Sequence, residues 1–438
     1  MRLKGAFVAF MLCAGLVSCA SSPMIQPQIN SLVAAERYDA ALRILKEHRY
    51  SYGEHNDLLY FMDFGLALHT AGEYRESIGY FEKAKAKYDQ LYTISVSRKA
   101  ATWLVNDNVD EYRGEDFERV LINVFQALNF ARLGDLEEAL VEARDADNAL
   151  ELINQSYSKE SVAYAHDAFA RLLMGILYAA AGGPDNINNA YISLVKSLSA
   201  YRDVYSVHYG VKIPELLKEE LAAAAQYLNF GDSAAWQADI GKVSFTPFTD
   251  RAGLAQVVVI HYRGLSPIKH QVDLPVVLPD GYVARIVFPN YTRRRYPDMA
   301  FTLQLRQGAE TVKARDTELV ENIEEIAVKA LEEKRLRVAA KAVLRAGAKH
   351  MALRAAEGGV RDSSGDTAAD VVKYSGMLFN VFSEQADLRS WQTLPAQIRM
   401  ARAFTEPGEY EIMLNEDVIE KCTLAAGETR FIIFRTSQ

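Results

Sequence analysis

Apolar side chains in the first half of the chain recur every three or four positions, which is the period of an amphipathic helix. The pattern is strongest in residues 59–89, where Phe61, Phe64 and Leu68 mark one helix and Gly72 precedes a second. The sequence therefore predicts two antiparallel helices joined by a tight turn at this glycine.

The same stretch has the features of a tetratricopeptide repeat. Such a repeat needs a small residue midway along its first helix, a turn residue further on, and large apolar residues where the two helices cross. Gly65, Gly72, Tyr74 and Phe81 fill these places, although Ser77 stands where alanine is usual. One repeat cannot bury both of its faces, so we expect neighbouring repeats.

Related patterns occur in residues 25–48, 117–146 and 169–200. We expect about four helical hairpins, stacked as a short right-handed solenoid over residues 31–228. A further helix over residues 215–228 follows Pro214 and would cap the stack, before a connector at residues 229–250.

Beyond residue 250 the apolar period changes from helical to two, which indicates β-strands. The expected strands are residues 256–262, 272–278, 283–288, 300–305, 310–314, 398–403, 409–414, 418–424 and 430–434. Glycine and proline residues separate them. We predict an antiparallel, sandwich-like domain over residues 251–438. The whole chain is then multidomain, with an α-solenoid followed by an α+β part.

A helical insertion, residues 316–383, interrupts these strands. Its first part, residues 316–358, is typical of a long amphipathic helix or kinked pair, with acidic residues at its start and basic residues toward its end. A polar loop at residues 358–370 and a second helix at residues 368–382 are expected to follow. The apolar stripe of the long helix has three candidate partners: the chain's own sheet or repeats, another protein, and anionic lipid.

The N-terminus has the pattern of a bacterial lipoprotein signal, because Arg2 and Lys4 precede an apolar run too short to span a bilayer comfortably. The run ends in a match to the lipobox, formed by Leu16, Val17, Ser18 and Cys19. Cleavage would remove residues 1–18, and acylation of Cys19 would anchor the chain through a tether, residues 19–30. An ordinary cleaved signal with a chance cysteine is the alternative interpretation.

Ala20, directly after the lipobox cysteine, is not the aspartate that retains many enterobacterial lipoproteins in the inner membrane. The sequence therefore favours the outer membrane, with the body of the protein facing the periplasm.

The 438 residues carry a net charge of −8 and are half apolar, so the chain is neither disordered nor a polyanion binder by bulk charge. The sequence motifs of zinc metalloproteases, serine hydrolases and P-loop NTPases are absent. His166, His261 and His270 come nearest to a metal or acid–base set. We predict no enzymatic activity, no metal, no cofactor and no nucleic-acid partner.

Polar residues on the concave side of the expected repeats are candidates for partner binding. Asn123, Gln126 and Asn129 lie on the first helix of a hairpin, the element that lines a concave solenoid surface. Their amides can pair with the backbone of an extended peptide. A solvated helix surface is the alternative.

Two stretches carry a resemblance to a known family. They are ALEEKRLRVAAKAVLRAGAK, residues 330–349, and SEQADLRSWQTLPAQIRMAR, residues 383–402, with Pro407 and Gly408 after them. The chain resembles a family of proteobacterial tetratricopeptide-repeat lipoproteins over most of its mature length. Genes of that family commonly lie beside the gene for a penicillin-binding-protein activator lipoprotein. The resemblance implies a role in the cell envelope and assigns no catalytic residues.

Within the second stretch, Asp387 and Arg389 are placed to form an ion pair covered by the indole of Trp391. That pair would stabilise the segment in which the chain passes from the helical insertion back to the strands. Recognition of a partner by Arg389 and Trp391 is the alternative.

These observations favour a non-enzymatic, outer-membrane-anchored scaffold whose solenoid holds an envelope protein, in peptidoglycan synthesis or in a secretion complex. The activator-type lipoprotein is the candidate partner. A glycan-binding or glycan-processing protein, with its site on the sandwich loops, is the alternative.

Overall fold

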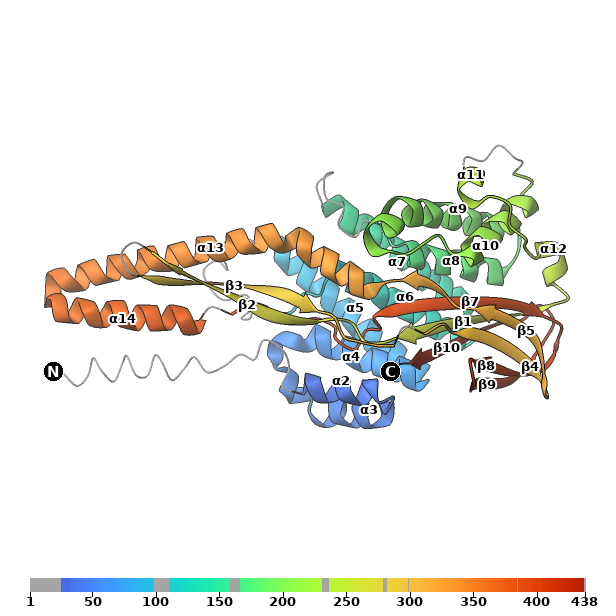
Figure 1. The fold of residues 1–438 in the computed structure, drawn as a ribbon, viewed down its shortest axis with the longest axis horizontal. Coiled ribbons are helices and arrows are strands. Elements are labelled where there is room, and N and C mark those ends of the chain that lie inside the picture. Colours follow the sequence, from blue (N-terminus) through green and yellow to red (C-terminus); the bar gives the residue numbers. More distant parts are fainter. Residues whose placement is uncertain are drawn as a thin grey trace.

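The computed structural model describes residues 25–97, 110–156, 166–230, 236–278, 282–297, 299–383 and 385–436. Helices make up its N-terminal part and strands dominate its C-terminal part, as the sequence predicts (Figure 1). The N-terminal helices form hairpins: α2 (Gln26–Ala34) with α3 (Tyr38–Glu47), α4 (Asp57–Ala71) with α5 (Tyr74–Ser97), α6 (Asp116–Arg132) with α7 (Leu136–Ser156), and α8 (Ala168–Ala181) with α9 (Pro184–Ala200).

Shorter helical elements join these hairpins to one another and to the strands. They are the 3₁₀ turns η1 (Arg49–Tyr52) and η2 (Glu54–Asn56), the π-helix η4 (Tyr201–Tyr209), and the helices α10 (Glu215–Tyr227), α11 (Gln237–Ile240) and α12 (Phe248–Arg251). Among the described residues, no helix is long and apolar enough to cross a bilayer.

The crossing of α4 and α5 follows from three residues of the repeat pattern. Gly72 ends α4 in the left-handed conformation, with φ of 85°. The ring of Phe81 then lies directly against Gly65, where no side chain stands in its way. Ser77, the departure from the pattern, donates a 2.7 Å hydrogen bond to the Gly65 carbonyl oxygen. The hydroxyl thus ties the two helices together at their closest approach.

Two four-stranded sheets pack face to face in the C-terminal part. The first has the order β10 (Thr429–Thr436), β1 (Ala255–Arg263), β7 (Gln397–Thr405), β6 (Glu318–Glu321), and β10 runs parallel to β1. The second is antiparallel, in the order β5 (Glu310–Asp316), β4 (Thr302–Gln307), β8 (Gly408–Leu414), β9 (Asp417–Leu424). The parallel pair makes the first sheet mixed, whereas the sequence predicts antiparallel pairing throughout.

Strand β1 joins the helical part to the sandwich, because all of its residues are buried. Val258, Ile260 and Tyr262 belong to the apolar core shared with the helical hairpins. Val257 and Val259, which point to the other face, belong to the core between the two sheets. One continuous core therefore extends from the helices into the first sheet.

A long stalk projects from this body (Figure 1). It consists of the two-stranded ribbon β2 (Ile268–Val277) and β3 (Val283–Thr292), the helix α13 (Ile323–Ser364), and the helix α14 (Asp366–Ser383). Helix α13 packs along β3, and α14 folds back against both of them. With 42 residues, α13 is about 63 Å long.

Three predictions fail in this region. Strands 272–278 and 283–288 are not part of the sandwich, because β2 and β3 pair only with each other among the described strands. Glu318 and Glu321, expected at the start of a helix, lie in β6, and α13 begins only after Asn322, whose side chain caps it. The polar loop expected at residues 358–370 is helical except at Gly365, which has φ of 85° and separates α13 from α14.

The contact between Gly65 and Phe81 makes a test of the α4–α5 packing. A Cβ atom at residue 65 would lie 2.8 Å from Cε1 of Phe81, so we expect Gly65→Ala to lower the free energy of unfolding by about 1–3 kcal/mol. Gly79→Ala on α5 meets no atom within 4 Å and should raise it by about 0.5–1 kcal/mol. Urea unfolding measures the free energy of unfolding of both variants. Equal effects of the two substitutions would contradict the close packing of Phe81 on Gly65.

Candidate functional site

The inner side of the helical hairpins is filled by the chain itself. The return segment, residues 385–396 between α14 and β7, inserts Trp391 among the helices. The Trp391 ring lies 5.7 Å from the ring of Phe125 and 6.3 Å from that of Phe81, between ring centroids. All three side chains are fully buried. The surface expected to be open to a partner is therefore covered by the chain's own return segment and by β1.

Asn129 is buried in this contact. Its amide group donates to Ser77 Oγ at 2.9 Å, and its Oδ1 lies 2.6 Å from Nδ1 of His69. Burial lowers the pKa of His69 to about 4, so the imidazole is neutral. Because Oδ1 can only accept, Nδ1 carries the proton, and Nε2 accepts from the hydroxyl of Tyr262 on β1 at 2.9 Å.

Asn123 and Gln126 are also buried. The amide group of Gln126 donates to Glu142 of α7 at 3.1 Å. The prediction that Asn123, Gln126 and Asn129 bind a partner at an open surface is wrong, because neighbouring helices and β1 cover them.

The Asp387–Arg389 ion pair forms as predicted. Arg389 donates from Nε to Oδ1 and from Nη2 to Oδ2, both at 2.8 Å. The aromatic cover is different: the guanidinium lies 5.5 Å from the ring of Tyr112, while Trp391 points to Phe125. Because Arg389 and Trp391 are buried, the alternative in which they recognise a partner at the surface is wrong.

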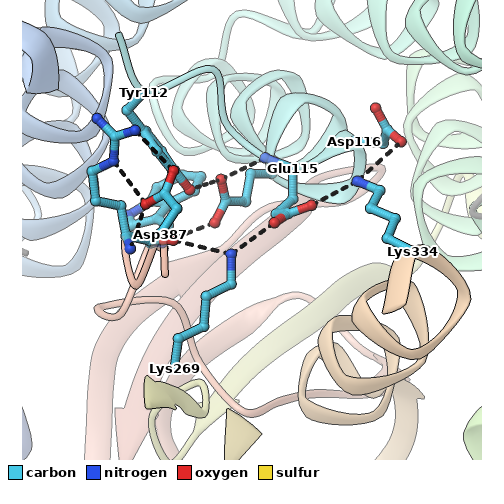
Figure 2. A network of polar contacts seen from close by, with 9 residues as sticks. Tyr112, Glu115, Asp116, Lys269, Lys334 and Asp387 are labelled. Atoms are coloured by element: carbon cyan, nitrogen blue, oxygen red, sulfur yellow. Dashed lines mark hydrogen bonds and ion pairs between the residues drawn. The ribbon is translucent and has the colours of Figure 1, made fainter. Parts of the chain in front are cut away.

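Next to this pair, one carboxylate joins the stalk to the helical part (Figure 2). Glu115, the residue before α6, accepts from Lys269 of β2 at 2.8 Å and from Lys334 of α13 at 2.7 Å. Lys269 also donates to the Arg389 carbonyl oxygen at 3.1 Å. We call Glu115, Lys269 and Lys334 the root clamp. It contacts both arms of the stalk where they leave the body.

Charge stabilises the root clamp. Burial alone would raise the pKa of Glu115, but Lys269 and Lys334 outweigh it and hold that pKa well below the ordinary value. Burial alone would lower the pKa of Lys269, but Glu115 above all outweighs it and raises that pKa. Glu115 and Lys269 are therefore charged at neutral pH, and removing Glu115 would leave the buried Lys269 without its carboxylate.

A second carboxylate links the root clamp to the return segment. Glu118 accepts from the backbone N–H of Trp391 at 2.8 Å, from the Tyr112 hydroxyl at 2.7 Å, and from the Glu115 N–H at 2.9 Å. Burial, and then the nearby charge of Glu115, raise the pKa of Glu118 to about 7 despite these donors. Figure 2 shows the whole network, from Tyr112 to Lys334.

A cavity of about 270 Å³ lies beside the root clamp, with Glu111, Arg113 and Asp387 among the residues of both signs in its wall. Mixed and mutually paired charges suit a structural joint better than a site for one charged ligand. Within the part of the chain that the structure describes, no group of His, Cys, Asp and Glu is arranged to hold a metal ion.

The histidines singled out in the sequence do not come together as one set. His261 bonds Thr436 at 2.7 Å, and His270 bonds Thr292 at 2.9 Å. His166 lies beside Arg171 at the start of α8.

Sequence reasoning missed the root clamp. The spacing of Glu115 and Glu118 before an apolar helical run is that of a capping box, and this was the available signal. Lys269 and Lys334 are isolated lysines far apart in the chain, and nothing in their local pattern predicts a shared partner.

Comparison of the chain with protein-family models, with curated proteins and with solved structures found no match.

The root clamp predicts a local effect of one substitution. Glu115→Gln leaves Lys269 and Lys334 without their carboxylate, so we expect a loss of about 3 kcal/mol and faster amide hydrogen exchange in β2 and in the first turns of α13. Glu332→Gln, at an exposed pair with Lys329 on the same helix, should change neither. If amide exchange in the stalk of Glu115→Gln is as slow as in the wild type, Glu115 does not hold the stalk to the body.

Glu118 predicts a pH dependence of stability. A carboxyl whose pKa rises from 4.5 to about 7 on folding holds its proton better in the folded chain, so its contribution is fully present below pH 4.5 and is lost as the pH rises toward 7. In Glu118→Gln, the free energy of unfolding should therefore fall less between pH 5 and 7.5 than in the wild type. The exposed Glu137→Gln should keep the wild-type slope. Identical slopes in all three would show that Glu118 does not titrate in this range.

Proposed function

We propose that this chain is a non-enzymatic lipoprotein of the bacterial cell envelope that holds a rigid stalk against a second envelope component. Acylated Cys19 would fix the protein on the outer membrane, facing the periplasm. The helical hairpins and sandwich form one body, and the stalk is the contact element. Fixing one end to a membrane raises the effective concentration of the other end near its target.

The observation that carries this proposal is the stalk itself. It extends beyond the shared core (Figure 1). It is held at its base by the root clamp and exposes large apolar side chains. Large apolar groups left in water on a projecting element are typical of an interaction surface. The inner side of the hairpins is filled, so the stalk takes the role first expected of the concave helices.

The hairpins are proposed to be of the tetratricopeptide class. The close contact of Gly65 with Phe81 is repeated in a later hairpin, where Gly175 lies against Leu194. Together with the resemblance to tetratricopeptide-repeat lipoproteins, this supports an envelope role. The activator lipoprotein of a penicillin-binding protein is the candidate protein partner.

Photo-crosslinking in intact cells tests the proposal. Tyr374 on α14 and Tyr50 in the helical part are both exposed, so p-benzoylphenylalanine fits at either position. We expect crosslinked adducts, with envelope protein or with lipid, from residue 374 and none from residue 50. Adducts should become fewer when Cys19→Ala removes the anchor, because the stalk would no longer be held near its target by the acyl chains.

Mass spectrometry of the adducts identifies the component. Absence of adducts at residue 374, or equal yields at both positions, would refute the stalk as the contact element. Adducts at residue 374 that persist unchanged in Cys19→Ala would refute the anchor and leave the stalk in its role.

A further inference from the structure

The outward face of α13 is apolar, which is the reverse of an ordinary surface helix. Val343, Leu344 and Met351 are 51%, 61% and 69% exposed. On the opposite face, the apolar residues that are fully buried in this part of the helix are small, Ala342 and Ala346, and the charged Arg345 and Glu357 are buried with them. A helix that buries alanines and presents leucine and methionine to water is built to meet something else on its outer side.

Other exposed positions continue this face along the helix. Ala340, Leu344, Gly347, Met351, Ala355 and Gly358 are exposed and follow one another at intervals of three or four. This spacing places them on one side of the helix. We call residues 340–358 on this side the apolar stripe. Between the large side chains, Ala and Gly project little from the helix, so a flat surface can approach the backbone there.

The rest of the stalk is apolar as well. Leu274 and Val277 on β2, and Val371 and Tyr374 on α14, are exposed. Nearly half of the exposed large apolar side chains in the described residues lie on the stalk, although it is a minor part of the chain. Exposed large apolar side chains are therefore concentrated on the stalk.

Basic residues outnumber acidic ones along this part of α13. Residues 334–356 contain seven Lys and Arg and no Asp or Glu, although Lys334 belongs to the root clamp and Arg345 is buried. The next acidic residue, Glu357, pairs with both Arg354 and Arg361. The target of the stripe must therefore accept apolar side chains and carry negative charge at the same surface.

An anionic bilayer has both properties. Leucine and methionine enter the boundary between headgroups and acyl chains, while Lys and Arg remain at the phosphate level. Each basic residue near such a surface adds attraction, and an exposed tyrosine such as Tyr374 suits the interfacial region. A second copy of the chain fits less well, because two stripes packed together would bring Lys349 and Arg354 of one copy toward basic residues of the other.

We propose that the apolar stripe binds the surface of an anionic phospholipid bilayer. The inference rests on the proposed function, in which the stalk is the contact element, and it names the component that the stalk contacts. The stalk lies on the bilayer surface, with α13 parallel to it, as a second attachment besides acylated Cys19.

Vesicle sedimentation tests the inference. The full chain carrying Cys19→Ala has no acyl anchor and is mixed with phosphatidylglycerol or phosphatidylcholine vesicles. We expect sedimentation with phosphatidylglycerol vesicles that weakens as salt is raised, and little with phosphatidylcholine. Leu344→Ser with Met351→Ser should weaken it about tenfold. Lys349→Gln with Arg354→Gln should weaken it about tenfold or more, because two basic side chains near the anionic surface are lost.

Matched control variants test whether vesicle binding is specific to the apolar stripe. Ile192→Ser with Val207→Ser removes exposed apolar side chains from the helical part, and Arg75→Gln with Lys242→Gln removes exposed charges there and in the connector. Neither double variant should change sedimentation. Circular dichroism and thermal unfolding show whether each variant is folded.

Equal sedimentation with both lipids, or loss in the control variants, would overturn the inference. So would absence of vesicle binding. If residue 374 still crosslinks to an envelope protein in that case, the stalk binds an acidic protein surface, and the proposed function stands while the lipid assignment fails. Absence of both vesicle binding and crosslinks would refute the lipid assignment and the proposed function together.

Discussion

Burial of Trp391 among the helical hairpins is the constraint on which the rest of the structure depends. Its ring packs on Phe81 and Phe125, and its backbone N–H is held by Glu118. Loss of a buried tryptophan costs about 3–5 kcal/mol, a large share of the stability of an ordinary domain. Thr393, two residues on, donates to the buried Asp63 of α4 at 2.5 Å. Strand β7 begins four residues later, so this docking also sets where the first sheet meets the helices.

The same docking decides which surfaces are left for other molecules. Amides at Asn123, Gln126 and Asn129 look available in a single helix, and all three are buried in the folded chain. Gln126 is bonded to Glu142 of α7, and Asn129 is linked through His69 to Tyr262 of β1. The large apolar side chains of the stalk stay exposed, because its elements lie beyond the reach of that core.

Local pattern predicted the helical hairpins well, because Gly65, Gly72 and Phe81 meet within one supersecondary unit. It predicted the Asp387–Arg389 pair for the same reason, since the two residues are neighbours in the chain. Local pattern failed wherever residues distant in the sequence decide the structure or the pairing of a segment. The period of two in β2 and β3 indicates strands and cannot say to which sheet they belong. Glu318 and Glu321 suit a helix start by composition, yet pairing with β7 makes their segment a strand.

The placement of the root clamp near one end of a long helix makes α13 a lever. From Lys334 to Ser364 the helix runs about 45 Å, so each degree of tilt at Glu115 displaces the far end by roughly 0.8 Å. A small change of angle at the root clamp therefore becomes a much larger displacement at the far end of the stalk.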